Sequence, residues 1–161
     1  MPLRSIDPTT GELIEEYEET TPSQLALILA EASCAFAGWR RTPFSERAPK
    51  MRAAADLLET RREELARLMA AEMGKPLAQG RAEADKCAWV CRYYADEAPG
   101  YLAARDVKTD ASKSFVTFEP LGPVLAVMPW NFPLWQVFRF AAPALMAGNA
   151  GLLKHAGNVT G

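Results

Sequence analysis

The sequence has little cysteine and histidine. Three cysteines and one histidine occur among 161 residues, and so small and odd a number of cysteines argues against a disulfide framework. Cys87 and Cys91 share one face of a predicted helix, whereas the single histidine, His155, lies far away in the sequence. We therefore interpret the two cysteines as small apolar residues of a buried helix face, in preference to a pair of metal ligands.

An excess of one charge and a long apolar run are also missing. The 18 basic and 20 acidic residues give a net charge of −2, which provides no electrostatic basis for binding nucleic acid or an anionic membrane. No apolar run approaches the roughly 20 residues that span a bilayer, and the N-terminal MPLRS lacks the apolar segment of a signal peptide. With 49% hydrophobic and 24% charged residues, the composition is that of a globular domain, and we expect it in the cytoplasm.

Local signals divide the first hundred residues into a strand pair and helices. Residues 3–19 are predicted to form two short strands around a turn at residues 7–11, where proline and glycine favour tight backbone geometry. A capping box of Thr21 and Gln24 begins a helix that ends at Gly38.

Two longer helical stretches follow, over residues 45–73 and 77–104. Gly74 and Pro76 separate them in the order expected at a helix end. Thr60 and Glu63 form a second capping box, which allows the first stretch to be two helices. Apolar residues recur at three- and four-residue spacing in all of these helices, so we expect their apolar faces to form the core.

The pattern changes to that of an α/β protein beyond residue 112. Residues 113–119 predict a strand, residues 124–128 a strand buried on both faces, residues 133–147 a helix and residues 151–154 another strand. A strand, a helix and a strand within about thirty residues predict a parallel βαβ unit. The carboxyl ends of both strands then open on the edge where such sheets bind ligands, which places Asn131 and Lys154 together.

Residues 128–133, MPWNFP, contain the first candidate for chemistry. Two prolines rigidify the turn, and Asn131 lies at its tip. A side-chain amide there can stabilise negative charge that develops on a carbonyl oxygen. The alternative is a turn asparagine that caps the following helix. Because a sheet of two parallel strands is not a stable unit, we also expect the sequence to be incomplete.

Five motifs resemble the aldehyde dehydrogenase family in their order along the chain, and the resemblance covers all of it. The resemblance implies a fold class of α/β, with a helical N-terminal portion leading into the first βαβ of a Rossmann-like nicotinamide-binding domain. It implies that residues 1–161 are the N-terminal part of that domain, about a third of a full-length member, and that the catalytic domain is absent. The motifs are DPTTGE at residue 7, EMGKP at 72, FEPLGPVLAV at 118, MPWNFPLWQ at 128 and AGNAGLLKHA at 147.

In this family a cysteine thiolate attacks the aldehyde, hydride passes to the nicotinamide, and a glutamate-activated water hydrolyses the thioester. The resemblance implies that Asn131 helps to form the oxyanion hole and that Lys154 binds the adenosine ribose. It further implies that the backbone of Val127, Met128, Pro129 and Trp130 lines the cofactor site. Cys34, Cys87 and Cys91 do not match the nucleophile's motif, so we expect the chain alone to be inactive.

The resemblance leaves two cofactors open, NAD and NADP. Many members that prefer NAD have a glutamate three residues after the lysine, where it bonds the ribose hydroxyls. This sequence has Gly157 at that position. Without the carboxylate, a 2′-phosphate meets less repulsion, and use of NADP becomes plausible.

Arg139 suggests the substrate. The residue follows Asn131 by about two helical turns, on the helix that borders the substrate entrance in this family. Succinate-semialdehyde dehydrogenases resemble the sequence in having arginine there, which would pair with the distal carboxylate. A surface arginine or an interdomain ion pair is the alternative. Phe132, Trp135 and Gln136 are candidates for the wall of the substrate tunnel.

The strand near residues 112–121 resembles part of the family's oligomerisation arm, so a homo-oligomer, a dimer or a tetramer, is expected for the full-length protein. Two other hypotheses remain open at this stage. One is a non-catalytic truncated product that binds other subunits. The other is an acylating enzyme that passes its thioester to coenzyme A.

Overall fold

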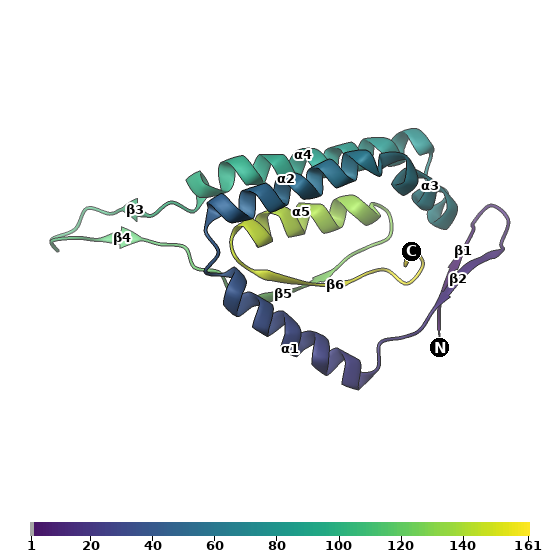
Figure 1. Ribbon diagram of the computed structural model, residues 1–161, viewed down its shortest axis with the longest axis horizontal. Coiled ribbons are helices and arrows are strands. Elements are labelled where there is room, and N and C mark those ends of the chain that lie inside the picture. Colours follow the sequence, from purple (N-terminus) through teal and green to yellow (C-terminus); the bar gives the residue numbers. More distant parts are fainter. Residues whose placement is uncertain (1) are drawn as a thin grey trace.

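Five helices and three small sheets make up the computed structural model, which describes residues 2–161. The strands pair as β1 with β2, β3 with β4 and β5 with β6. Figure 1 shows the helices α2, α3 and α4 as an upper layer, with α5 and the β5–β6 sheet beneath it. The helices are α1 (Pro22–Trp39), α2 (Phe44–Thr60), α3 (Arg62–Met73), α4 (Leu77–Tyr101) and α5 (Pro133–Met146), and the strands are β1 (Leu3–Ile6), β2 (Leu13–Tyr17), β3 (Arg105–Asp106), β4 (Phe115–Val116), β5 (Pro123–Val127) and β6 (Ala150–Lys154).

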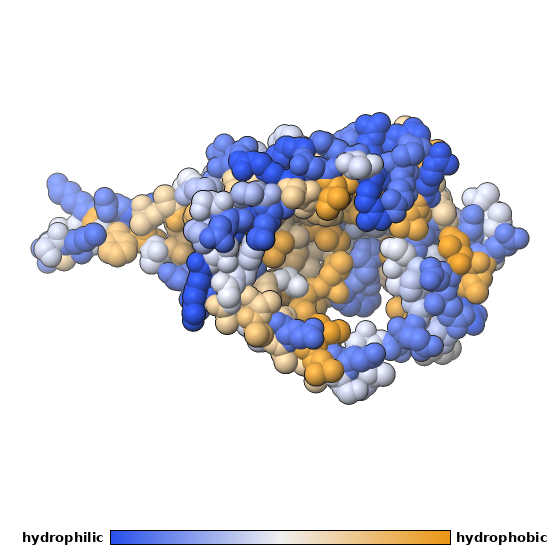
Figure 2. All heavy atoms as spheres, viewed as in Figure 1, coloured by the Kyte–Doolittle hydropathy of each residue, from blue (hydrophilic) through white to orange (hydrophobic). Residues whose placement is uncertain are grey.

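The core lies where α4 packs against α2 and α5. Its residues are mostly small, which allows the helices to approach closely. Cys87 and Cys91 are fully buried within it, as interpreted from the sequence. Figure 2 shows hydrophilic residues over the outer side of the α2–α4 layer and hydrophobic residues within the hollow beneath it. The buried core residues are Ala48, Met51, Ala55, Leu58, Cys87, Ala88, Val90, Cys91, Ala95, Ala98, Ala142 and Met146.

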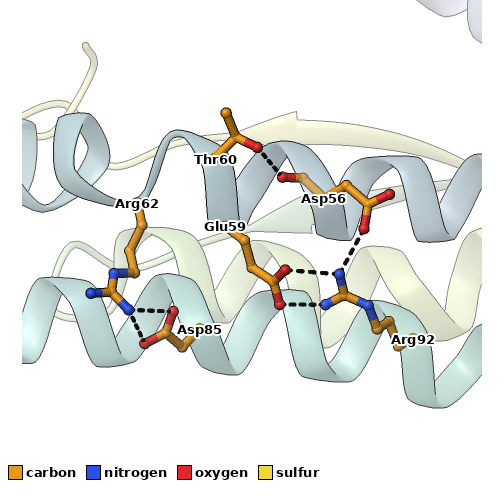
Figure 3. A network of polar contacts seen from close by, with 6 residues as sticks. All are labelled: Asp56, Glu59, Thr60, Arg62, Asp85 and Arg92. Atoms are coloured by element: carbon orange, nitrogen blue, oxygen red, sulfur yellow. Dashed lines mark hydrogen bonds and ion pairs between the residues drawn. The ribbon is translucent and has the colours of Figure 1, made fainter.

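Exposed ion pairs join the outer surfaces of this layer (Figure 3). Arg92 on α4 reaches Asp56 at 2.7 Å and Glu59 at 2.5 Å on α2. Arg62 on α3 reaches Asp85 on α4 at 3.2 Å. Pairs so exposed to solvent typically contribute about 0–1 kcal/mol each, so the apolar core carries most of the stability of the layer.

The capping box predicted for α1 is confirmed, but the predicted burial of α1 is wrong. Thr21 accepts a hydrogen bond from the Gln24 amide at 3.3 Å, and the Gln24 side chain accepts one from the Thr21 amide at 2.8 Å. No residue of α1 is buried, and Leu25 is 50% exposed. The reason is that α1 contacts β5 and β6 on one side, while the chain provides no element that covers its remaining apolar surface.

The stretch over residues 45–73 forms two helices, but not through the predicted capping box. Thr60 stays in the last turn of α2, where its hydroxyl donates to the Asp56 carbonyl oxygen at 2.8 Å. Arg61 is the N-cap of α3 and contributes no side-chain cap. Gly74 ends α3 in the left-handed conformation with φ 67°, as predicted, because glycine adopts this conformation without a steric cost.

The predicted βαβ unit is confirmed. Strands β5 and β6 are parallel, and Val127 pairs with Lys154 at their carboxyl ends. Helix α5 connects them, and the sheet lies between α5 and α1 (Figure 1). Arg47 of α2 fixes the C-terminal end of α5 by donating to the Met146 carbonyl oxygen at 2.8 Å.

The strand predicted over residues 113–119 is much shorter than expected. Only Phe115 and Val116 form β4, which pairs antiparallel with β3. Strand β3 also has two residues, and the pairing continues beyond it through the Val107 amide, which donates to the Ser114 carbonyl oxygen at 2.9 Å. The β3–β4 arm projects away from the helices (Figure 1).

We predict opposite effects of alanine at two glycines of α4. A Cβ atom at Gly80 would meet the Ala66 Cα atom of α3 at 2.9 Å, whereas nothing lies within 4 Å of one at Gly100. Overpacking should make Gly80→Ala destabilising by about 1–3 kcal/mol. Gly100→Ala should be neutral or stabilising by up to about 1 kcal/mol. Thermal denaturation of both variants checks this, and a Gly80→Ala protein that melts at or above the parent temperature contradicts it.

Candidate active site

The carboxyl ends of β5 and β6 form the edge at which the sequence placed its candidate residues. The Met128 amide donates to the Lys154 carbonyl oxygen at 3.0 Å and extends the pairing by one residue. Lys154 is exposed, beside a cavity of about 600 Å³. This cavity lies between the N-terminal strand pair and the end of β6, and Leu3, Tyr17 and His155 are among its lining residues. The strand ends therefore present a free cation next to a concave surface.

Asn131 lies in the loop between β5 and α5 with its side chain exposed. Within residues 2–161 no hydrogen bond involves the Asn131 side-chain amide, and α5 has no side-chain cap from its N-cap residue, Phe132. The alternative of an asparagine that caps the following helix is therefore wrong. The amide remains available to a ligand.

Glu83 of α4 provides the cap instead. Its Oε1 atom accepts hydrogen bonds from the backbone amides of Leu134 at 3.0 Å and Trp135 at 2.9 Å. These are free donors of the first turn of α5, where a carboxylate also interacts favourably with the helix dipole. Pro133, the first residue of α5, has no amide hydrogen to satisfy.

Lys75 completes this arrangement. The Lys75 and Glu83 side chains form an ion pair in which they are 5% and 2% exposed. Lys75 also donates to the Asn131 carbonyl oxygen at 3.0 Å and lies 4.2 Å from the Phe132 ring centroid. Lys75 belongs to the EMGKP motif, but nothing in the sequence pattern predicted this role for it. One signal was available, since Glu83 precedes the buried Cys87 by one helical turn and thus lies on the buried face of α4.

A second cavity, of about 310 Å³, lies between α4 and the start of α5. Phe132 and Trp135 line it, and the Lys86 ammonium lies 4.0 Å from the Trp135 ring centroid. Gln136 is half-buried and Arg139 is exposed, and neither belongs to the lining. Of the four residues predicted to bind the substrate, the structure thus brings two, Phe132 and Trp135, together at one cavity. The lining residues are Gln79, Ala82, Glu83, Lys86, Phe132 and Trp135.

The buried cysteines are poor nucleophiles. Burial, with a smaller contribution from the nearby Glu83 charge, raises the pKa of the Cys87 thiol far above its usual range. Burial also raises the pKa of Cys91, to about 11. A thiol reacts as its thiolate, which is scarce at neutral pH under these conditions. Neither residue therefore has the properties of a catalytic cysteine.

Residues 2–161 contain neither a cluster of metal-ligating side chains nor a helix suited to a membrane. No group of three or more histidine, cysteine, aspartate or glutamate side chains there is arranged to hold a metal ion. None of the helices in the described part of the chain combines the length and the apolar character that crossing a bilayer requires.

A parallel βαβ unit with a free amide and an exposed lysine at its strand ends places the chain among the α/β proteins, whose ligands commonly bind at this edge of the sheet. A comparison with known families shows which α/β family this is. The model of the aldehyde dehydrogenase family matches residues 1–160, and the chain belongs to this family.

Similar proteins include a probable succinate-semialdehyde dehydrogenase [NADP(+)] of Synechocystis, 54% identical over 99% of this chain. Succinate-semialdehyde dehydrogenase [NADP(+)] 1 of Mycobacterium tuberculosis is 51% identical over 99% of it. The chain spans 35% of the length of both of these relatives.

Solved structures agree in fold. Succinic semialdehyde dehydrogenase from Streptococcus pyogenes, in complex with NADP+, superposes with a TM-score of 0.93 at 33% identity, over 98% of this chain and 35% of that one. An NAD-dependent benzaldehyde dehydrogenase from Corynebacterium glutamicum gives a TM-score of 0.91 at 28% identity, over 99% of this chain and 35% of that one. The α/β fold class predicted from the sequence is confirmed.

Proposed function

We propose that this chain contributes the oxyanion donor and part of the cofactor site to an NADP-dependent succinate-semialdehyde dehydrogenase of the relatives' length. The observation that carries the proposal is the free side-chain amide of Asn131, held in a rigid loop at the carboxyl ends of two parallel strands. Membership of the family and the names of the relatives support the reaction class and the substrate.

Asn131 would act on the aldehyde oxygen. When a nucleophile adds to the carbonyl carbon, negative charge develops on this oxygen, and a preorganised N–H donor stabilises that charge without having to reorient. Two observations support this role: Lys75 holds the Asn131 carbonyl oxygen, and the Asn131 side chain has no partner within residues 2–161 that would compete for its N–H groups. The nucleotide cofactor, when bound, supplies the hydride acceptor.

The nucleotide would lie along the ends of β5 and β6. Lys154 projects its charge there, and the backbone of Val127, Met128, Pro129 and Trp130 forms the adjoining edge. Lys154 lines a cavity of about 600 Å³, in which Glu18 and Glu19 lie on the side of the N-terminal strand pair, so Lys154 is the cation that would contact the nucleotide. Gly157 adds no carboxylate to this surface, which favours a ribose with a 2′-phosphate.

The distal carboxylate of the substrate would bind Arg139. This guanidinium has no ion-pair partner among residues 2–161 and lies on α5, one turn beyond Trp135 of the cavity wall. Phe132, Trp135 and Gln136 would line the approach to Asn131. None of the three cysteines suits the role of nucleophile, so we expect residues 1–161 alone to oxidise no aldehyde.

The β3–β4 arm would serve assembly of the full-length protein into a homo-oligomer. Phe115, Val116 and Phe118 are exposed on the arm. The ladder of β3 with β4 includes only two residues of each strand, so the backbone after Val116 can pair with another strand. An extended segment of this kind can add to the edge of a neighbouring subunit's sheet.

Asn131→Ala tests the proposal directly. We expect kcat for succinate semialdehyde in the full-length protein to fall by about 100-fold or more, the usual loss for one oxyanion donor. The melting temperature should stay unchanged, since the side chain makes no hydrogen bond within residues 2–161. Steady-state kinetics check this, and an unchanged kcat removes Asn131 from the mechanism.

Arg139→Ala tests the substrate. We expect KM for succinate semialdehyde to rise about 10- to 100-fold, as one charge-assisted hydrogen-bonded contact contributes about 1.5–3 kcal/mol. KM for butanal, which has no carboxylate, should change little. Arg139→Lys is the matched control and should keep part of the affinity. Equal effects on both aldehydes would show that Arg139 has another role.

Gly157→Glu tests the cofactor. A carboxylate near the 2′-phosphate should lower the ratio of kcat/KM for NADP to that for NAD by about tenfold, equivalent to about 1.4 kcal/mol. The new Cβ atom would lie 3.2 Å from the Leu3 Cδ2 atom, the end of a flexible side chain. Gly157→Gln has the same size without the charge and should leave the ratio near the parent value. A ratio that falls equally in both variants contradicts the electrostatic explanation.

A further inference from the structure

Lys75 and Glu83 both form hydrogen bonds to the segment that runs from the Asn131 carbonyl group into the first turn of α5. Glu83 accepts hydrogen bonds from the amides of Leu134 and Trp135, which follow the loop. Lys75 donates to the carbonyl oxygen of Asn131 itself. We propose that this buried ion pair is the positioning device that sets the direction of the Asn131 side chain for catalysis. The inference rests on the proposed function of Asn131.

The burial of both charges is the first argument. The side chains are 5% and 2% exposed, and an ion pair removed from water is costly unless further hydrogen bonds compensate the lost hydration. Here the further bonds all go to one short segment, residues 131–135. The exposed pairs of the same helical layer, such as Arg62 with Asp85, join helix to helix (Figure 3), and their hydrogen bonds do not involve residues 131–135.

The division of roles at the loop is the second argument. Because Glu83 caps α5, the Asn131 side chain is not needed as a cap and remains free for a ligand. Because Lys75 binds the Asn131 carbonyl oxygen, the peptide group next to that side chain cannot rotate without breaking a bond to a buried cation. The Phe132 ring, 4.2 Å from the Lys75 ammonium, restricts the following residue as well. The pair therefore fixes the backbone from the Asn131 carbonyl group to the first turn of α5.

A variant that removes both charges tests the device. Lys75→Met together with Glu83→Gln keeps similar side-chain volumes and retains an acceptor for the Leu134 and Trp135 amides. It deletes the donor to the Asn131 carbonyl oxygen. Removing both partners also avoids an unpaired buried charge, so the fold should persist. Arg62→Met with Asp85→Asn is the matched control, a double neutralisation of an exposed pair on the same layer.

We expect the Lys75→Met, Glu83→Gln protein of full length to lose about 10- to 100-fold in kcat, the effect of a misplaced catalytic group. KM for succinate semialdehyde should change less than threefold, and the control pair should leave both constants unchanged. In an Asn131→Ala background, the same double substitution should cause no further loss, because it acts through Asn131. An unchanged kcat, or a loss that simply adds to that of Asn131→Ala, overturns the proposal.

Amide hydrogen exchange separates this inference from the proposed function. In the Lys75→Met, Glu83→Gln protein the amides of Leu134, Trp135 and Gln136 should exchange at least tenfold faster, because a neutral acceptor replaces the carboxylate that holds the first turn of α5. The amides of the α2–α4 core should not change. If the full-length parent protein does not oxidise aldehydes, the proposed function is refuted, and with it the catalytic role of the ion pair. Unchanged exchange at these three amides would refute the positioning itself, whatever the activity. If the double variant proves unstable, Lys75→Arg, which keeps a cation beside Glu83 but displaces the donor to the Asn131 carbonyl oxygen, supplies the same two measurements.

Discussion

The burial of two opposite charges between α4 and the start of α5 is the constraint on which the candidate site depends. Lys75 and Glu83 leave water almost completely, and their retained hydrogen bonds go to the backbone around Asn131. The helical layer thus does more than shield an apolar core. It fixes the one loop that joins β5 to α5, and Arg47 fixes the opposite end of α5 through the Met146 carbonyl oxygen. The helix that follows the loop is held at both ends by charged side chains from the same layer.

The residues that hold the loop differ from the residue that we propose to act on the substrate: Lys75 and Glu83 bind the backbone, and the Asn131 side chain stays free. The parallel pairing of Val127 with Lys154 places the strand ends at one edge, and the loop then turns Asn131 out of that edge with its amide free. Phe132 and Trp135, which follow Asn131 in the chain, line a cavity together with residues of α4. In the function we propose, these parts supply a donor to the oxyanion, a wall for an organic substrate and a cation for the cofactor.

Local pattern was enough to predict the βαβ unit, because β5, α5 and β6 have distinct periodicities and the rules of chain topology fix their pairing. It was not enough for α1, whose apolar positions indicate that a face is covered but not by which element. The Thr60 capping box failed because a threonine can equally bond to the carbonyl four residues earlier in its own helix. Lys75 and Glu83 were missed because charged residues are usually solvated, and their partners lie more than fifty residues further along the chain. The resemblance to the family supplied the role proposed for Asn131, which the residues alone left open.

The most direct test of the central claim is a crystal structure of the full-length protein with NADP and an unreactive analogue of succinate semialdehyde. If Asn131 is the oxyanion donor, its side-chain nitrogen should lie about 2.7–3.1 Å from the oxygen that represents the aldehyde carbonyl. The hydrogen bond from Lys75 to the Asn131 carbonyl oxygen should still be in place. An Asn131 amide bonded to a protein group instead of the ligand, or a loop released from Lys75 when the ligand binds, would contradict the claim.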